Sequence, residues 1–282
     1  IDVVSHFFRS ASIKTKLMLS MAACLALFLA ISATLSVSLT AKGLRARAVN
    51  QELPTVVGEI RNDILHQIAK PVSASLGLAN NTFLHGWEAL DLPDEGMPAW
   101  TAYAQQLKKF SGATMVFWAS DSSGKFLTEK GFDRVLEKTT SRDDWLPKFL
   151  ASGKAYELNL DNDVSTNKMM LFINARVEAA PGKLGAAGLG LSVDNMAQSV
   201  RNYRVGKSGY VYLVRADGSV LVHQNAALAD GKHFMKDLPG FSEALSAKLL
   251  GGAKFAHDAY DAAGGKRLVA SSFVPELNLY VV

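Results

Sequence analysis

The chain has 282 residues, of which 49% are hydrophobic and 20% are charged, so one or two domains can each bury a core. The formal net charge of +4 is small, and the basic residues are scattered along the chain, which argues against nucleic acid as a partner. Cys24 is the single cysteine, so an intrachain disulfide and a cysteine-based metal cluster are excluded.

Residues 17–41 carry no charged side chain, and at about 1.5 Å per residue they exceed a hydrocarbon core of about 30 Å. This pattern predicts a transmembrane helix. A cleaved signal peptide is the alternative, because 32–41 is rich in small residues, but its apolar core would be only about 7–15 residues long. Basic residues flank both ends, so the positive-inside rule does not fix the orientation.

We expect residues 1–16 to form a short cytoplasmic stub, because the globular sequence all follows the apolar segment. The protein is then anchored in the bacterial inner membrane, with its globular part in the periplasm. Apolar residues recur at steps of three and four through 44–84, including Val57, Ile60 and Ile64, which predicts a long helix with one apolar face. Pro54 and Pro71 can kink or interrupt it.

A second helix is predicted over 98–110, and we assign 42–97 to the long stalk helix and its connection. An internal repeat then follows. Residues 112–127 and 209–222 each read as a glycine, an apolar strand, a polar turn containing glycine and a second strand.

Each copy of the repeat is followed by helical sequence and a further hairpin, with turns at Pro181-Gly182 and Gly264-Gly265. The sequence therefore predicts an α+β fold with two tandem modules, 98–200 and 201–282. Each module has an antiparallel sheet with helices on one side.

A transmembrane helix, a long stalk helix and two tandem PAS-like sheets, in this order, resemble the double Cache sensor domains of bacterial chemoreceptors, histidine kinases and diguanylate cyclases. The resemblance covers about 44–282, and 143–177 is similar to the pocket-forming segment of the membrane-distal module. It implies that module 98–200 binds the ligand and that module 201–282 lies near the membrane. It also implies a homodimer, for which the apolar face of the stalk helix offers an interface.

The best-known subgroup of that family recognises amino acids with an arginine two positions before a tryptophan, a tyrosine directly after it, and two aspartates further on. Trp145 and Asp163 match this pattern, but Asp143 stands at the arginine position, Leu146 at the tyrosine position and Gly190 at the second aspartate position. An acidic residue cannot hold a ligand carboxylate.

The departures favour a cationic or neutral nitrogenous ligand, an amine or a heterocyclic base, held by Asp161 and Asp163 through charge-assisted hydrogen bonds. Trp145 and Phe149 lie four residues apart and either stack over the ligand or belong to the core. Trp118 either faces the pocket or packs under a helix. Simple turn chemistry is the alternative for both aspartates. Our ligand-binding candidates are Trp118, Asp143, Trp145, Phe149, Asp161 and Asp163.

The sequence predicts no catalytic residue, metal or cofactor. Residues 161–172 lack the glycine and glutamate of a calcium loop, the histidines form no close ligand pair, and no hydrolase or phosphate-loop motif is present. We therefore expect a methyl-accepting chemoreceptor that binds a small solute and signals across the membrane. A histidine kinase or diguanylate cyclase sensor is one alternative, separable by sequence after Val282. A membrane-anchored hydrolase is another, and requires His223, His233 or His257 buried beside a serine and a carboxylate.

Overall fold

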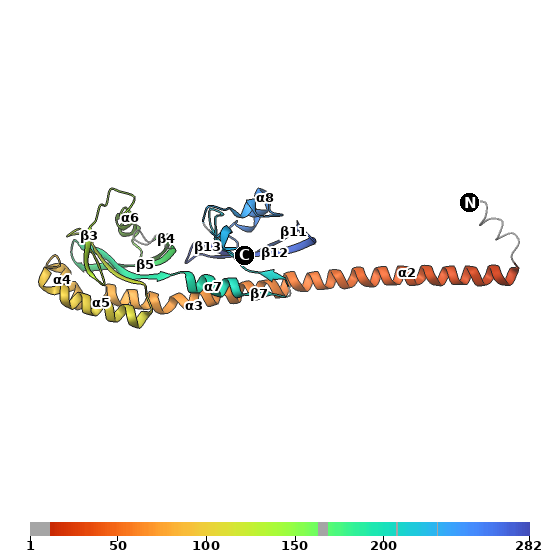
Figure 1. Cartoon of the computed structure of the whole chain (residues 1–282), viewed down its shortest axis with the longest axis horizontal. Helices are drawn as coiled ribbons and strands as arrows, with labels where there is room; N and C mark the ends of the chain where they lie inside the picture. The colour runs from red at the N-terminus through yellow and green to blue at the C-terminus, as the bar shows by residue number, and fades with distance from the viewer. Residues whose placement is uncertain (1–11, 163–168, 207, 230) are drawn as a thin grey trace. The chain divides into compact units, whose positions relative to one another are not determined.

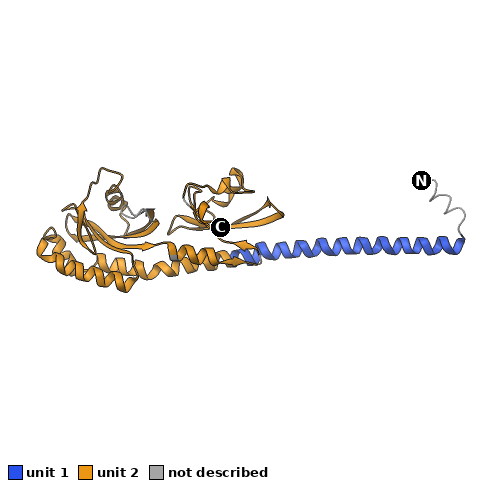
Figure 2. Ribbon diagram, in the orientation of Figure 1, with its two compact units in different colours: residues 1–55 blue, residues 56–282 orange. Residues whose placement is uncertain are grey.

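The computed structural model describes residues 12–162, 169–206, 208–229 and 231–282, and the chain divides into two compact units, residues 1–55 and 56–282 (Figure 2). Helix α2 (Ile13–Arg47) makes up most of the first unit, and Ser12 caps it by accepting a hydrogen bond from the Thr15 amide. No residue of α2 is buried in the described chain, and apolar side chains such as Phe28 are exposed. By length and composition this helix can cross a membrane.

A π-helical turn (Ala48–Glu52) separates α2 from α3 (Leu53–Ala79), which contains Pro71. The apolar side chains predicted for one face of this helix are almost inaccessible: Val57, Ile60, Ile64 and Ile68 are exposed by only 1–6%. The single chain thus already covers the face that we expected to form a dimer interface. That expectation is corrected, while the homodimer itself stays a prediction.

The connection between the stalk helix and the first sheet is itself helical. Helix α3 ends at Ala79, because the Asn81 side chain accepts hydrogen bonds from two amides in the first turn of α4 (Thr82–Ala89). A 3₁₀ turn (Asp94–Gly96) leads into α5 (Met97–Ser111), which begins with proline in its first turn and ends at Gly112 with φ 70°. The helix predicted over 98–110 is confirmed.

The first module contains a six-stranded antiparallel sheet with the order β3-β2-β1-β6-β5-β4. The predicted repeat forms its β1–β2 hairpin, and the turn at Gly182 joins its two longest strands. The strands are β1 (Met115–Ser120), β2 (Lys125–Thr128), β3 (Gly131–Val135), β4 (Tyr156–Asn162), β5 (Met169–Ala180) and β6 (Lys183–Ser192).

Successive residues of a strand point to opposite sides of the sheet, and both faces of this sheet are covered by helices. Helices α3 and α5 lie along one face, and the short helix α6 (Trp145–Ser152) lies on the other (Figure 1). Trp100 of α5 and Leu78 of α3 belong to the core on the first face, whereas Leu146 and Phe149 of α6 belong to a separate core on the second. We call the second face the α6 face.

The second module contains a five-stranded antiparallel sheet with the order β10-β9-β13-β12-β11, and the predicted α+β fold is confirmed. Helix α7 (Asp194–Asn202) and the two-stranded pair β7 (Arg204–Val205) and β8 (Gly209–Tyr210) precede it. Its elements are β9 (Leu213–Arg215), β10 (Val220–Val222), α8 (Glu243–Leu249), β11 (Ala256–Ala262), β12 (Gly265–Val274) and β13 (Leu279–Val281), with 3₁₀ turns at Ala226–Leu228 and Met235–Asp237.

Helix α3 contacts elements of both modules. Near its start, Glu59 accepts a hydrogen bond from the Tyr203 hydroxyl at 2.9 Å, and Arg61 lies 3.5 Å from Glu276 in the turn before β13. At its end, Leu78 and Ala79 belong to the core beneath the first sheet. One helix therefore connects the two sheets.

Candidate functional site

The α6 face of the first sheet carries a cluster of aromatic rings. Phe117 of β1 stacks on Phe126 of β2 with ring centroids 5.8 Å apart, and Trp145 of α6 meets Phe117 edge-on at 6.1 Å. Phe149 is 1% exposed, whereas Trp145 is half-buried and keeps part of its ring accessible. This face therefore offers an aromatic wall with one open edge at Trp145.

A buried ion pair fixes the segment that leads into α6. Asp143 is inaccessible, and its carboxylate accepts a hydrogen bond from Arg134 at 2.7 Å and another from the Glu137 amide at 2.9 Å. Burial acts to raise the pKa of Asp143, but the hydrogen bonds from Arg134 and Glu137 and the guanidinium charge outweigh it, so the pKa is lowered. Arg134 also lies 4.0 Å from the centre of the Phe126 ring.

The other end of α6 is held by Arg176 of β5. Its guanidinium donates hydrogen bonds to the backbone carbonyls of Leu150 and Lys154, which are at the end of the helix and just beyond it. The Leu150 carbonyl also accepts from the Gly153 amide at 3.4 Å, and a cationic donor beside the last turn further stabilises the helix end. Together Arg134 and Arg176 fix α6 over the sheet.

A polar cluster lies on the same face, further along the sheet toward β4. Glu157 accepts hydrogen bonds from the side-chain amides of Asn159 at 2.8 Å and Asn174 at 3.3 Å, both at its Oε1 atom. Asn174 is 3% exposed, although it stands in the middle of an apolar strand. Glu157 Oε2 has no partner among the described residues, so it is available to accept from another donor.

The strand register places Asp161 beside this cluster. Asp161 pairs with Met170, two positions from the pair of Asn159 with Phe172, so Glu157, Asn159 and Asp161 share the α6 face. Gly190 pairs with Phe172 on the neighbouring strand, and a Cβ atom there would come within 2.8 Å of Met170 Cε. Because Gly190 has no side chain, Met170 and Phe172 of β5 can pack over its backbone.

The structure brings together four of the six residues that the sequence singled out. Trp145, Phe149 and Asp161 lie on the α6 face, and Asp143 lies directly before α6. Each carboxylate oxygen of Asp143 already accepts one hydrogen bond from the protein, which gives Asp143 a positioning role. In this arrangement neither oxygen is free to make the ligand contact that the sequence predicted. Asp163 lies outside the described residues, and the ligand-binding roles remain predictions.

Trp118 requires a correction, because it points to the opposite face of the sheet. It is fully buried in the core with Trp100, whose ring it meets edge-on at 6.2 Å. Its Nε1 donates to Glu88 of α4 at 2.8 Å. Trp118 thus packs under the helices and cannot reach a ligand on the α6 face.

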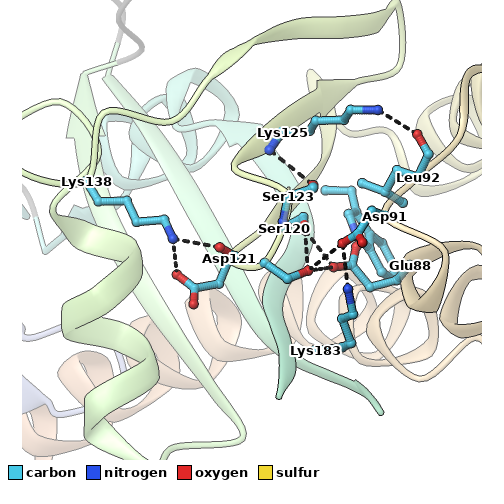
Figure 3. A network of polar contacts seen from close by, with 11 residues as sticks. Glu88, Asp91, Leu92, Ser120, Asp121, Ser123, Lys125, Lys138 and Lys183 are labelled. Atoms are coloured by element: carbon cyan, nitrogen blue, oxygen red, sulfur yellow. Dashed lines mark hydrogen bonds and ion pairs between the residues drawn. The ribbon is translucent and has the colours of Figure 1, made fainter. Parts of the chain in front are cut away.

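Glu88 is the centre of a polar network that joins α4 to the sheet (Figure 3). Its buried carboxylate also accepts from Ser120 at 2.6 Å and Ser122 at 3.1 Å. Beside it, Lys183 at the start of β6 pairs with Asp91 at 2.6 Å. These contacts fasten two hairpin turns to the helical connection.

Sequence reasoning missed Glu157, Asn159 and Asn174. Two signals were present. Glu157, Asn159 and Asp161 alternate along β4, as side chains on one face of a strand do, and Asn174 interrupts an apolar run. Among the residues that the structure describes, no group of three or more histidine, cysteine or acidic side chains could hold a metal ion.

Several solved structures that resemble this chain are sensory or ligand-binding domains of receptors. The ligand-binding domain of the Pseudomonas aeruginosa amino acid chemoreceptor PctC, in complex with GABA, is 20% identical over 83% of this chain and 97% of that chain, with a TM-score of 0.61. The sensory domain of the Campylobacter jejuni chemoreceptor Tlp3 is 14% identical over 87% of this chain and 94% of that chain, with a TM-score of 0.59. This chain has a sensory-domain fold.

The sensory-domain fold is not confined to chemoreceptors. The extracellular domain of the putative histidine kinase mmHK1S-Z2 is 12% identical over 83% of this chain and 95% of that chain, with a TM-score of 0.63. No family model matches the sequence. The likeness therefore identifies the fold, and the sensory-domain fold is compatible with more than one kind of receptor output.

Proposed function

We propose that the chain is the ligand-sensing region of a bacterial transmembrane receptor of the methyl-accepting chemotaxis type. In this proposal 17–41 crosses the inner membrane, 1–16 lies in the cytoplasm and the two modules lie in the periplasm. The sensory-domain fold and the apolar, unburied helix α2 support it. A histidine kinase or cyclase output is the alternative, because a histidine kinase extracellular domain shares the fold.

We also propose that module 98–200 holds the ligand on its α6 face. The observation that carries this proposal is the half-buried carboxylate of Glu157. Its carboxylate is oriented by two amide donors and has one oxygen without a partner among the described residues. The half-buried Trp145 ring and Asp161 share this face.

The chemistry of this face favours an amine or a nitrogenous base. A protonated amine forms charge-assisted hydrogen bonds with a carboxylate, and an aromatic ring stabilises a nearby cation. Two carboxylates, at Glu157 and Asp161, would by contrast repel an anionic ligand.

The membrane-anchored hydrolase has no comparable support in the described residues. His223 is the buried member of the three histidines at issue, and its contacts are with Tyr210, Tyr212 and the Asn225 amide. His233 and His257 are exposed.

A thermal-shift screen of the full chain in detergent tests the ligand class, because a ligand that binds only the folded state raises the melting temperature. The screen covers amines, purines, pyrimidines, amino acids and organic acids. We expect a shift with an amine or base. Glu157→Gln keeps the acceptor for both asparagines but removes the charge, and should weaken binding by about 10- to 100-fold, the loss of one charge-assisted hydrogen bond of about 1.5–3 kcal/mol.

Glu95→Gln is the matched control, because Glu95 is an exposed carboxylate in the 3₁₀ turn before α5. It should leave the affinity unchanged. Equal affinities for the unmodified chain and Glu157→Gln would remove the α6 face from consideration as the ligand site, without affecting the assignment of the fold.

A further inference from the structure

The second module contains an aromatic cluster that the proposed function does not use. The ring centroid of His223 lies 5.4 Å from that of Tyr210 and 5.4 Å from that of Tyr212. Tyr260 of β11 packs on Phe241 at 4.8 Å, and both rings pack against the same core as Tyr212. We call these five residues the aromatic cup.

The Tyr212 hydroxyl is the exceptional group in this cup. Tyr212 is 4% exposed, and its hydroxyl has no hydrogen-bond partner among the described residues. Buried polar groups in proteins are nearly always hydrogen-bonded, because leaving one unpaired costs the full desolvation of the group. Burial, followed by the nearby Tyr210 and Tyr260 side chains, raises the pKa of Tyr212 well above its ordinary value. The hydroxyl therefore keeps its proton and can donate it.

The hydroxyl of Tyr280, in the same core, is by contrast fully hydrogen-bonded. Its hydroxyl donates to the Leu250 carbonyl at 2.6 Å and accepts from the Gly252 amide at 2.8 Å. Both tyrosines belong to one apolar cluster, yet only Tyr280 has its hydroxyl paired within the described chain. The contrast makes Tyr212 a buried donor that has no partner within the described chain.

His223 supplies a second donor beside Tyr212. Its Nδ1 accepts a hydrogen bond from the Asn225 amide at 3.0 Å, so in the neutral ring the proton is on Nε2. Burial lowers the pKa of His223, which favours this neutral form at pH 7. Two neutral donors, one phenol and one imidazole, thus lie together in an apolar setting.

A surface groove lies between α8 and β11, and Tyr260 is the residue of the cup that lines it. Its charged lining residues are Lys248, Asp258 and Asp261, and Lys248 pairs with Asp258 at 2.7 Å. Tyr260 lines the groove and also packs against the core that contains Tyr212. Arg267 pairs with Tyr260 across the two strands and is exposed, so it places a positive charge beside the cup.

We infer that the aromatic cup is a second small-molecule site, and that its ligand is a small organic carboxylate with an apolar body. The Tyr212 hydroxyl and the His223 Nε2–H donate to the carboxylate oxygens, and the Tyr210, Tyr260 and Phe241 rings pack on the apolar body. Arg267 attracts the anion to the groove. This chemistry is the opposite of that on the α6 face, where two carboxylates favour a cation.

Titration calorimetry on the full chain in lipid nanodiscs tests the inference. The probes are propionate, butyrate and benzoate, with propionamide and propylamine as neutral and cationic counterparts. We expect the carboxylates to bind more tightly than both counterparts. Tyr212→Phe should weaken carboxylate binding at least tenfold, while the melting temperature without probe stays the same or rises, because the variant removes an unpaired hydroxyl.

Tyr280→Phe is the matched control, since it makes the same chemical change in the same core but breaks two hydrogen bonds. It should lower the melting temperature and leave carboxylate affinity unchanged. Glu157→Gln should also leave carboxylate affinity unchanged, which separates this site from the α6 face.

Three results would overturn the inference. The first is the absence of any heat of binding on titration with the carboxylates, and the second is equal carboxylate affinity in Tyr212→Phe and the unmodified chain. The third is a fall in melting temperature for Tyr212→Phe as large as that for Tyr280→Phe, which would mean that the hydroxyl is already satisfied in the empty protein. None of these results would affect the proposal for the α6 face.

Discussion

The two modules share a plan but differ in the side chains on the corresponding parts of their sheets. The α6 face of the first module carries an ion pair, an acidic strand and two asparagines, whereas the aromatic cup of the second carries neutral hydroxyl and imidazole groups. Alternation and turns specify both sheets. In our proposals the few inward-facing residues that are not apolar determine which ligand each sheet binds, so fold and ligand chemistry are encoded separately.

Asp143→Ala should produce the largest difference in stability between the two modules. The substitution leaves Arg134 with only its exposed partner Asp133, and breaking a buried ion pair costs roughly 3–5 kcal/mol. We expect hydrogen exchange to accelerate over α6 and the preceding loop of the full chain, while the second module is unaffected. Equal acceleration in both modules would show that they do not open separately.

Asp144→Asn is the control for that experiment. Asp144 is adjacent in sequence, but it pairs with the exposed Lys148 at 2.6 Å, four residues along the helix. Such pairs contribute only about 0.3–0.5 kcal/mol. Its exchange pattern should therefore match that of the unmodified chain.

A smaller effect is expected from Glu88→Gln, on the opposite face of the first sheet. The glutamine oxygen can still accept from Trp118 Nε1, and its NH₂ group can donate to the Ser120 hydroxyl, which rotates to accept, so the variant loses the negative charge rather than the contacts. Hydrogen bonds to a charged group stabilise by roughly 1 kcal/mol more than neutral ones, so we expect a loss of about that size. Thermal unfolding should show a lower melting temperature, and Glu95→Gln should show none of this loss.

The smallest effect is expected from acidification. The pKa of Asp143 is lower in the folded chain than the unfolded value of about 3.9, so the unfolded chain takes up the proton first. The stabilisation is fully present above about pH 4 and is lost as the pH falls through the folded pKa. The difference in melting temperature between the unmodified chain and Asp143→Ala should therefore narrow below pH 4. A constant difference would show that the carboxylate stabilises the fold by packing alone.

Much of the architecture could be predicted because its determinants are local. Steps of three and four residues predicted the buried face of α3, and glycine turns between alternating strands predicted the hairpins at Gly182 and Gly264. The break after Ala79 was missed because it depends on one side chain, Asn81, capping a new helix.

The candidate site was predicted less completely, because its contacts join distant strands. Alternation showed that Trp118 and Val116 share a face, but nothing local tells which face a helix will cover. Asp143 became a ligand-binding candidate because it stands at the arginine position of the family pattern, and its ion pair with Arg134 was not foreseen because Arg134 lies on a separate strand. Asn174 was visible as a polar residue in an apolar strand, yet its partner Glu157 becomes evident only from the register of β4 and β5.

The continuity of α3 has a thermodynamic consequence. The helix contacts Tyr203 and Glu276 near its start and the first sheet's core at its end. If occupancy of the α6 face changes the affinity of the aromatic cup by some factor, occupancy of the cup must change the affinity of the α6 face by the same factor. In a receptor with both sites, the response to one solute would then depend on the concentration of the other, and equally so in both directions.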